Sequence, residues 1–405
     1  MTSPADHETI MPVIDPKEFP SVVEGVDSVR LYDELREKYP FFKVEGDPAV
    51  YFTRWASGNE ILRKWQRYSA NIRGGGYATG DHEVDEHRLI PPEYDPPLAN
   101  RYKALLRDKY SPEEAQRWEP RMRRLAGELV DGLAGRGEAD YVADFSTRYF
   151  PRIVMEWLGL PAEDFDRVQE WDRTVFTVPE ADPDMSRRGQ AVVSLQAYLA
   201  EAVRQRREQP DDGFISFVLA GDIDGRPISD VEARQAALMG VLGGSHTVTA
   251  MLGYVMRHLA DHPELRARFV KDVEGRPRIV EELLRWYALG GTYRTVTEDH
   301  ELDGCPLRQG DVVMTLLNPA NRDPRSRPGA DELDPDREPN THLTFAAGVH
   351  LCLGIHFARS GLQIALEEWL SRIPDFELRP GATPPEQIYA GVGYLELPFV
   401  WPVQG

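Results

Sequence analysis

The chain has 405 residues, of which 67 are acidic and 47 are basic, giving a net charge of −20 at pH 7. A balance this acidic argues against general attraction to nucleic acid or to an anionic membrane surface. With 41% hydrophobic and 28% charged residues, the composition is that of a globular protein with a large core.

The first 17 residues are polar and acidic, and they lack the apolar core of a signal peptide or membrane anchor. Two cysteines, Cys305 and Cys352, give no disulfide framework. No stretch reads as a linker, because the Pro-, Gly- and Asp-rich residues 321–340 form a loop between motifs. We therefore expect a single domain over residues 1–405, a cytoplasmic location and no membrane association.

The N-terminal part predicts a helix followed by strands. Residues 28–40 read as a short helix, and residues 41–53 alternate as strands do, which indicates an N-terminal sheet. Residues 70–94 combine three consecutive glycines with charges of both signs, and this pattern predicts a flexible loop.

Helices are expected to dominate from Pro97 to about Asp261. Apolar residues recur at i, i+3 and i+4 within 122–133, 150–158 and 192–207. The longest helix should start after Ser229, its N-cap, and end near Ala260, at a length of roughly 48 Å. Because residues 236–255 carry few charges, this central helix should be buried nearly all round.

Shorter elements are expected after the central helix. We predict a helix at 277–287, strands at 293–296 and 312–316, a final helix to 373, and a hairpin at 389–400. The expected fold class is therefore mainly α with a small β region.

The loop 345–354 places Cys352 between glycines, directly before a helical pattern. A thiolate there would sit at a helix N-terminus, where unpaired backbone N–H groups and the helix dipole favour negative charge. Gly348 and Gly354 would let the backbone approach a flat partner closely. An axial cysteine ligand of haem iron needs this kind of environment.

Two other interpretations of Cys352 stay open. A free cysteine is most often a buried structural residue. A metal site could instead combine Cys352 with His342, His350 and His356. Neither explains two glycines, a phenylalanine and a following helix at these offsets.

The spacing from Phe345 to Gly354 reads F-x-x-G-x-H-x-C-x-G, and with this signature the chain resembles the cytochrome P450 family. The resemblance implies the fold of that family, with haem b (iron protoporphyrin IX) between the central helix and the cysteine loop. It makes Cys352 the axial ligand of the iron. It also implies that Phe345, Gly348, His350 and Gly354 bind the cofactor.

The central helix contains Gly243, Gly244, His246 and Thr247. Glycines cost a buried helix about 1 kcal/mol each, so they need a reason: close approach of a flat ligand, or simple helix packing. In the family, a threonine here helps to protonate dioxygen and a neighbouring acid relays protons. The resemblance gives these catalytic roles to Thr247 and His246. His246 departs from the usual acid, as in the sterol 14-demethylases of the family, and proton relay and a structural role are equal alternatives for it.

Glu282 and Arg285 form an i,i+3 pair on the helix 277–287, which by itself indicates a solvated surface pair. In this register the pair resembles the E-x-x-R motif of the family, which an arginine, here Arg337, completes. The resemblance implies a structural role for all three residues, in fixing the loop that presents Cys352.

Haem propionates are carboxylates and need Arg, Lys or His donors. By position in the family, these donors are Arg294, His350 and Lys103. The family commonly has histidine at the position of Ala99 and arginine at that of Lys103, so the chain departs from the pattern at both.

Residues 101–124 hold eight basic and four acidic residues, a local charge of +4. This is either a solvated helix face or a basic docking patch for an acidic electron donor. The sequence contains no flavin or nicotinamide domain. The expected partners are therefore a ferredoxin and a ferredoxin reductase, which pass on electrons from NAD(P)H.

Substrate contacts in the family come from the central helix, the segment after E-x-x-R and the C-terminal hairpin. The matching residues here are Leu242, Leu289, Thr292, Tyr293, Ala390, Gly391 and Val392. Residues 367–376 and the motif Gly-Gly-x-x-Thr-Val resemble the camphor-hydroxylase branch.

We therefore expect a haem-thiolate monooxygenase that inserts one oxygen atom of O2 into a small or medium organic molecule, such as a terpenoid or another secondary metabolite. Two alternatives stay open. One is a haem-thiolate enzyme with an altered reaction: oxidative coupling, rearrangement or peroxide-driven oxidation. The other is a non-catalytic haem-thiolate protein that binds a ligand.

Overall fold

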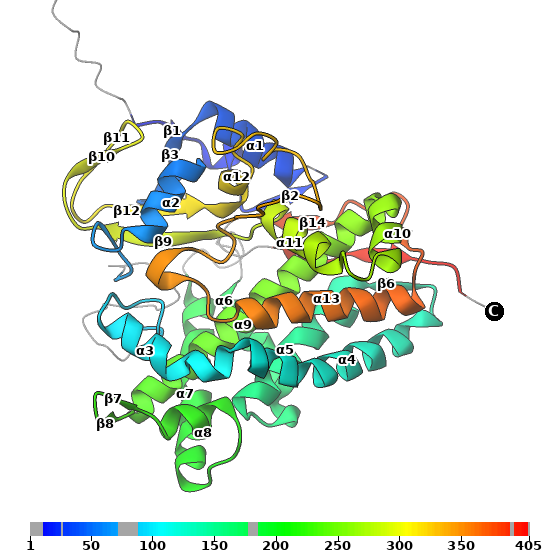
Figure 1. Cartoon of the computed structure of the whole chain (residues 1–405), viewed down its shortest axis with the longest axis horizontal. Coiled ribbons are helices and arrows are strands. Elements are labelled where there is room, and N and C mark those ends of the chain that lie inside the picture. Colours follow the sequence, from blue (N-terminus) through cyan, green and yellow to red (C-terminus); the bar gives the residue numbers. More distant parts are fainter. Residues whose placement is uncertain (1–10, 26, 72–87, 177–184, 389–392, 404–405) are drawn as a thin grey trace, which may run out of the picture.

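The computed structural model describes residues 11–25, 27–71, 88–176, 185–388 and 393–403. Helices form most of this part of the chain, and the strands β1, β3, β9 and β12 gather with α1, α2 and α12 at one end of it (Figure 1). The expected fold class, mainly α with a small β region, is confirmed. Most of the loop expected at 70–94 lies outside the described residues.

The helices follow one another with short connections. In chain order they are α1 (Ser28–Lys38), α2 (Trp55–Arg63), α3 (Leu98–Leu106), α4 (Pro112–Ala134), α5 (Thr147–Leu158), α6 (Phe165–Val175), α7 (Ser186–Glu208), α8 (Phe214–Leu219), α9 (Asp230–Asp261), α10 (Pro263–Lys271), α11 (Arg276–Trp286), α12 (Leu317–Asn321) and α13 (Ile355–Arg372).

The strands are short. They are β1 (Val13–Ile14), β2 (Val22–Glu24), β3 (Phe41–Val44), β4 (Val50–Phe52), β5 (Tyr68–Ser69), β6 (Glu138–Asp140), β7 (Asp222–Ile223), β8 (Arg226–Pro227), β9 (Gly291–Val296), β10 (His300–Leu302), β11 (Cys305–Leu307), β12 (Val312–Leu316), β13 (Glu377–Leu378), β14 (Pro385–Gln387), β15 (Gly393–Tyr394) and β16 (Pro398–Val400).

The largest sheet has six strands in the order β1-β3-β4-β12-β9-β5. The expected N-terminal strands are present as the antiparallel pair β3 and β4, with Phe41 opposite Phe52. Strand β12 then joins β4 in parallel and β9 in antiparallel orientation. The sheet thus connects the N-terminal part to the segment that follows α11.

The prediction of one C-terminal hairpin over 389–400 was wrong. Strand β15 pairs with β14, whereas β16 pairs with β13 and β6. Alternation along a strand shows which side chains share a face, but it does not identify the partner strand. Residues 389–392 lie outside the described residues.

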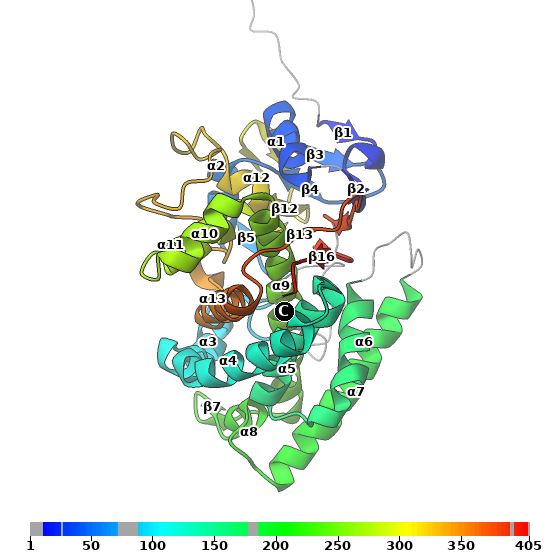
Figure 2. The same cartoon turned by 90° about the vertical axis from the view of Figure 1, so that its right-hand side faces the viewer.

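Helix α9 is the expected central helix. The Ser229 side chain accepts a hydrogen bond from the Glu232 backbone N–H, and the Glu232 side chain accepts one from Ser229, so a capping box starts the helix. Figure 2 shows α9 running through the middle of the molecule, and it contacts α5 and α13.

By length and composition, α9 could also cross a membrane. Within the described residues, however, 67% of its most apolar 18-residue window is buried inside the protein. The apolar composition of α9 is therefore accounted for by its place in the core.

Helix α13 follows the cysteine loop and lies alongside α4 (Figure 1). On another side, α13 packs against α5 at Gly361, where a Cβ atom would collide with the ring of Phe150. Arg123 on α4 forms ion pairs with Glu367 and Glu368 on α13, at 2.7 and 2.8 Å. These contacts fix the helix that begins directly after Cys352.

Candidate active site

A cavity of about 360 Å³ lies between α9, α5, the start of β9 and the loop before α13; we call it the central cavity. Several predicted site residues line it, although they come from four separate parts of the sequence. They are Lys103, Leu242, Gly243, Gly244, Thr247, Leu289, Thr292, Phe345, His350, Cys352 and Gly354. The fold thus brings the cysteine loop and the glycine-threonine segment of α9 to one space.

The loop around Cys352 is closed by its own backbone. The Cys352 N–H donates to the Phe345 carbonyl at 2.9 Å. Gly348 has a φ of +66°, and a Cβ atom there would lie 3.2 Å from the Cα of Arg63 on α2. Gly348 therefore serves the turn and the contact with α2. Gly348 is not among the residues that line the central cavity, and its approach to a flat partner stays a prediction.

The Cys352 side chain is exposed to the central cavity, yet the surrounding protein raises the pKa of its thiol. The largest cause is desolvation by the packed walls. The Gly354 backbone N–H and the positive charges of Lys103 and Arg359 act in the opposite direction, but they do not outweigh it. The helix N-terminus alone therefore does not lower the pKa of this thiol. A bound metal ion would favour its thiolate form.

The two glycines of α9 also make room for protein side chains. A Cβ atom on Gly243 would lie 2.1 Å from the Met239 methyl group, and one on Gly244 would lie 3.1 Å from Val154 of α5. Both glycines still line the central cavity. The same positions thus permit close helix packing and leave the cavity open.

Thr247 lies one turn after Gly243 and lines the central cavity. Its hydroxyl donates to the Gly243 carbonyl at 2.8 Å. This bond orients the hydroxyl oxygen at the cavity wall, where it can accept or exchange a proton.

His246 does not line the central cavity. Its ring stacks on Phe176, the residue that ends α6, with ring centroids 3.9 Å apart and an interplanar angle of 8°. The proton-relay role expected for His246 stays a prediction, and the stacking supports the structural alternative.

Two of the expected propionate donors are buried polar groups. Arg294 is 4% exposed, and its Nε has no hydrogen-bond partner, while one terminal nitrogen donates to the Tyr293 carbonyl at 2.6 Å. Burial lowers the pKa of Arg294 to about 10. The Nε2 of His350 is likewise buried without a partner.

Burial lowers the pKa of His350 to about 3, and the positive charges of Arg294 and Lys103 lower it further. The negative charge of Asp95 acts on Arg294. Among the described residues, however, neither the Arg294 Nε nor the His350 Nε2 has a hydrogen-bond partner, and buried donors of this kind fit an anionic ligand. Together with an accessible thiol in an apolar cavity, these donors fit haem and its propionates.

Lys103 lines the central cavity and also holds the cysteine loop. Its Nζ donates to the carbonyls of Val349 and Leu351, at 2.9 and 2.6 Å. A lysine has three donor hydrogens, so one remains for a propionate while two hold the cysteine loop.

The Glu282–Arg285 pair is buried, in contrast to a surface ion pair. Both side chains are 0% exposed, and two hydrogen bonds of 2.7 Å join them. Glu282 also accepts from Arg337 at 3.4 Å and from the Asp334 backbone N–H at 2.7 Å. The three predicted structural residues thus form one cluster beneath the loop that leads to Cys352.

The sequence analysis missed two polar residues that extend this cluster. Asn321 accepts from the Leu343 N–H at 2.7 Å and donates to the Arg285 carbonyl at 3.1 Å. Arg322, 0% exposed, donates to the carbonyls of Trp286 and Val29. These bonds reach backbone atoms of elements that are distant in the sequence, such as Trp286 of α11 and Val29 of α1, and such contacts leave no periodic signal in a sequence.

The substrate-pocket residues were predicted in part. Leu242, Leu289 and Thr292 line the central cavity. Tyr293 does not line it, because neighbouring residues of a strand face opposite sides, and Tyr293 packs with the N-terminal core instead. Ala390, Gly391 and Val392 lie outside the described residues.

The largest omission is the wall formed by α5, which the sequence showed only as an apolar helix. Its cavity-lining residues are Phe150, Ile153, Val154 and Trp157.

The two alternative interpretations of Cys352 gain no support. Within the described residues, no group of three His, Cys, Asp or Glu side chains is arranged to hold a metal ion. His342 lies 2.8 Å from Glu281, away from Cys352. The buried structural cysteine is Cys305 in β11, whose thiol pKa is raised to about 12 by burial.

Comparisons with known proteins agree with this geometry. A model of the cytochrome P450 family matches residues 277–402. Mycinamicin IV hydroxylase/epoxidase from Micromonospora griseorubida is 31% identical over 96% of this chain and 99% of its own. Nocardicin C N-oxygenase from Nocardia uniformis subsp. tsuyamanensis is 34% identical over 76% of this chain and 78% of its own.

The solved structure of CYP101J2 superposes with a TM-score of 0.84 and covers 100% of both chains at 24% identity. At this identity the likeness shows the fold.

Proposed function

The chain belongs to the cytochrome P450 family and is a monooxygenase of that family, and we propose that it inserts one oxygen atom of O2 into a small or medium-sized secondary metabolite. The observation that carries the proposal is the common cavity of the Cys352 thiol and the Thr247 hydroxyl. Haem held there by Cys352 would supply the oxygen activation and C–H oxidation.

We assign the binding of that group to four residues. Cys352 gives the axial sulfur, and Arg294, His350 and Lys103 give N–H donors for the propionates. The partnerless Arg294 Nε and His350 Nε2 support this assignment, because an anion satisfies both donors. The buried Glu282–Arg285–Arg337 cluster holds the loop that carries Cys352.

We assign proton transfer to Thr247. Its Oγ1 lines the cavity 2.8 Å from the Gly243 carbonyl, so the hydroxyl hydrogen is held at a known place and can be replaced from water. The apolar side chains of α5, with Leu242 and Leu289, exclude bulk water from the same space.

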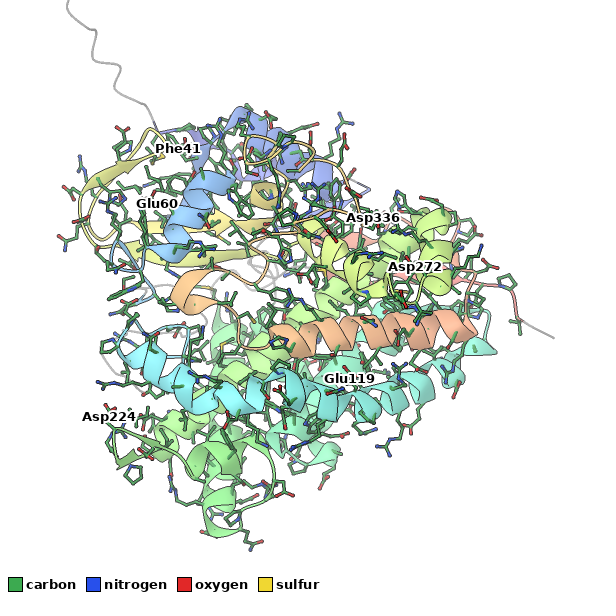
Figure 3. All side chains as sticks on the ribbon, in the orientation of Figure 1. Phe41, Glu60, Glu119, Asp224, Asp272 and Asp336 are labelled. Carbon is green, nitrogen blue, oxygen red and sulfur yellow. The ribbon has the colours of Figure 1, made fainter. Side chains whose placement is uncertain are left out.

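We propose that the electrons come from a ferredoxin with its reductase and NAD(P)H, in the cytoplasm. The basic stretch 101–124 is less positive than its composition indicated. Arg101, Arg117, Arg121 and Arg123 all form ion pairs; Figure 3 labels Asp224 on the β7–β8 hairpin, the partner of Arg101.

Two exposed cations, Arg107 and Arg124, form no ion pair among the described residues. We therefore centre the docking proposal on these two residues.

Turnover of the purified, haem-loaded protein tests the proposal. Candidates from a panel with mycinamicin IV, nocardicin C and several terpenoids are first selected by the shift they cause in the haem absorption. Each is then incubated with ferredoxin, reductase, NAD(P)H and isotopically labelled O2. The proposal predicts a product that carries one labelled oxygen atom.

Product without labelled oxygen would instead indicate coupling or rearrangement. Product formed with hydrogen peroxide but never with the ferredoxin system would indicate a peroxide-driven oxidation. Either result overturns the proposed reaction while leaving the haem site intact.

A further inference from the structure

We propose that His246 is a positioning residue for Thr247, and that it acts by joining three separate elements around Phe176 rather than by relaying protons. The proposal rests on the proposed function, because it assigns proton transfer to Thr247. We call the contacts of His246, Phe176 and Gln387 the Phe176 junction.

The first half of the Phe176 junction is a ring stack between α9 and the end of α6. The His246 and Phe176 rings are nearly parallel, 8° apart, with centroids at 3.9 Å. Phe176 is 5% exposed, so the stack is shielded from water. Stacked rings in such a place resist sliding, because any displacement opens a gap in a closely packed core.

The second half joins the same residue to the C-terminal sheet. The Gln387 side chain of β14, 6% exposed, donates to the Phe176 carbonyl at 2.8 Å. A buried hydrogen bond is costly to break without replacement. Phe176 is therefore held by its ring to α9 and by its backbone to β14.

The junction fixes the turn of α9 that carries Thr247. Successive helix residues differ by about 100° in direction, so His246 and Thr247 face different sides. With His246 held against Phe176, Thr247 faces the central cavity, where its hydroxyl donates to the Gly243 carbonyl. A rotation of this turn would move the Thr247 hydroxyl away from the reacting atoms, and a shift of about 1 Å can cost 10²-fold in rate.

Two substitutions at one position separate positioning from proton relay. His246→Phe keeps a flat ring to stack on Phe176 but cannot carry a proton. His246→Asp restores the residue type usual in the family but removes the ring. If His246 positions Thr247, the phenylalanine variant behaves as the unmodified protein and the aspartate variant does not. If His246 relays protons, the aspartate variant behaves as the unmodified protein and the phenylalanine variant does not.

The first readout needs no substrate. Each haem-loaded variant is reduced with dithionite, mixed with air-saturated buffer, and followed for the rate and pH profile of its reoxidation. We expect His246→Asp to change the rate about tenfold, in the direction that Thr247→Ala changes it, because both displace one hydroxyl. We expect His246→Phe to keep the rate and the pH profile. A shift of the pH profile in His246→Phe with none in His246→Asp overturns the proposal.

The second readout is hydrogen–deuterium exchange of the amides at the end of α6. His246→Asp and Gln387→Leu should each speed their exchange about tenfold, since each removes one half of the junction. Equal exchange in all variants would also overturn the proposal. His262→Phe is the matched control: His262 stacks on His258 with the same 3.9 Å centroid distance, at the far end of α9.

Failure of the proposed function gives a different pattern. If Thr247→Ala itself leaves the reoxidation rate unchanged, the assignment of proton transfer to Thr247 is wrong. The exchange experiment still decides whether the Phe176 junction exists.

Discussion

At the scale of single residues, the site combines groups whose properties depend on what surrounds them. The loop motif identifies Cys352. Its position before a helix favours a thiolate, but the packed walls of the cavity raise the pKa of the thiol. Arg294 and His350 are buried donors with partnerless nitrogen atoms. Both observations indicate a site completed by a bound metal and an anion.

Thr247 provides the first residue-scale prediction. Thr247→Ala removes the hydroxyl at the cavity wall, so electrons should be diverted from product to hydrogen peroxide. We expect product per NAD(P)H to fall about tenfold, less than the 10²–10⁴-fold typical of a positioned proton donor because water can partly replace the hydroxyl. Product and peroxide are measured together.

Thr249→Ala is the control for Thr247→Ala, since Thr249 lies on the same helix but donates to the Ser146 carbonyl instead. Thr247→Ser should restore most of the coupling. An unchanged product yield in Thr247→Ala would show that this hydroxyl transfers no proton.

At the scale of elements, buried polar clusters hold the site together. The cluster of Glu282, Arg285 and Arg337 joins α11 to the segment before the cysteine loop. A second buried carboxyl, Glu386, joins β14 to α9, because the Tyr254 hydroxyl donates to it at 2.8 Å. The i,i+3 spacing alone would have indicated a surface pair, and only the fold shows that the side chains of Glu282 and Arg285 are buried.

Glu282→Gln tests the first of these clusters. The change leaves Arg285 buried without its counter-charge, and breaking a buried pair costs about 3–5 kcal/mol. We expect a loss of this size in the free energy of unfolding, measured by urea titration, together with faster haem release.

The matched control is Glu201→Gln, which breaks an i,i+3 Glu–Arg pair of the same 2.7 Å length on the exposed surface of α7. It should leave the unfolding midpoint unchanged. Equal effects of the two substitutions would mean that burial of the Glu282 pair has no energetic consequence.

Glu386 provides a prediction on pH. Burial, assisted by the negative charge of Asp27, raises its pKa from 4.5 to about 7, although hydrogen bonds from Ser28 and Tyr254 and the charge of Arg257 oppose the rise. The folded protein thus keeps a proton that the unfolded chain releases. This contribution to stability is fully present below pH 4.5 and is lost as pH rises to about 7.

Glu386→Gln should remove that dependence. Between pH 5 and pH 8, the variant should gain about 2–3 kcal/mol in free energy of unfolding relative to the unmodified protein. Urea titrations of both proteins at the two pH values measure the difference. If the difference in free energy of unfolding between the two proteins does not grow from pH 5 to pH 8, Glu386 is already ionised in the folded protein.

At the scale of the whole molecule, the sequence predicted helices and motifs well and long-range partners poorly. The capped central helix and the strands β3 and β4 were predicted from local patterns. The site residues of α9 and of the cysteine loop were expected from the resemblance to the family. The pairing of β15 with β14 and of β16 with β13 was not, since strand partners depend on the packing of distant segments. The α5 wall was missed for the same reason.

The charge of a surface also depends on tertiary contacts that the sequence does not show. Composition gives residues 101–124 a charge of +4, but ion pairs with residues outside this stretch neutralise three of its six arginines. Arg107→Glu with Arg124→Glu should therefore raise the KM for ferredoxin about tenfold at low ionic strength, and less at high salt, with kcat unchanged. Arg308→Glu, an exposed arginine between β11 and β12, is the control. An equal rise of the KM for ferredoxin in Arg308→Glu would contradict the proposed docking surface.

The central claim is that Cys352 is the axial ligand of a bound haem. The most direct test is the absorption spectrum of the dithionite-reduced protein under carbon monoxide, recorded for the unmodified protein, Cys352→Ser and Cys305→Ser. We predict a strongly red-shifted Soret band that Cys305→Ser retains and Cys352→Ser loses. A histidine-like band in folded unmodified protein, or a red-shifted band that survives Cys352→Ser, would contradict the account.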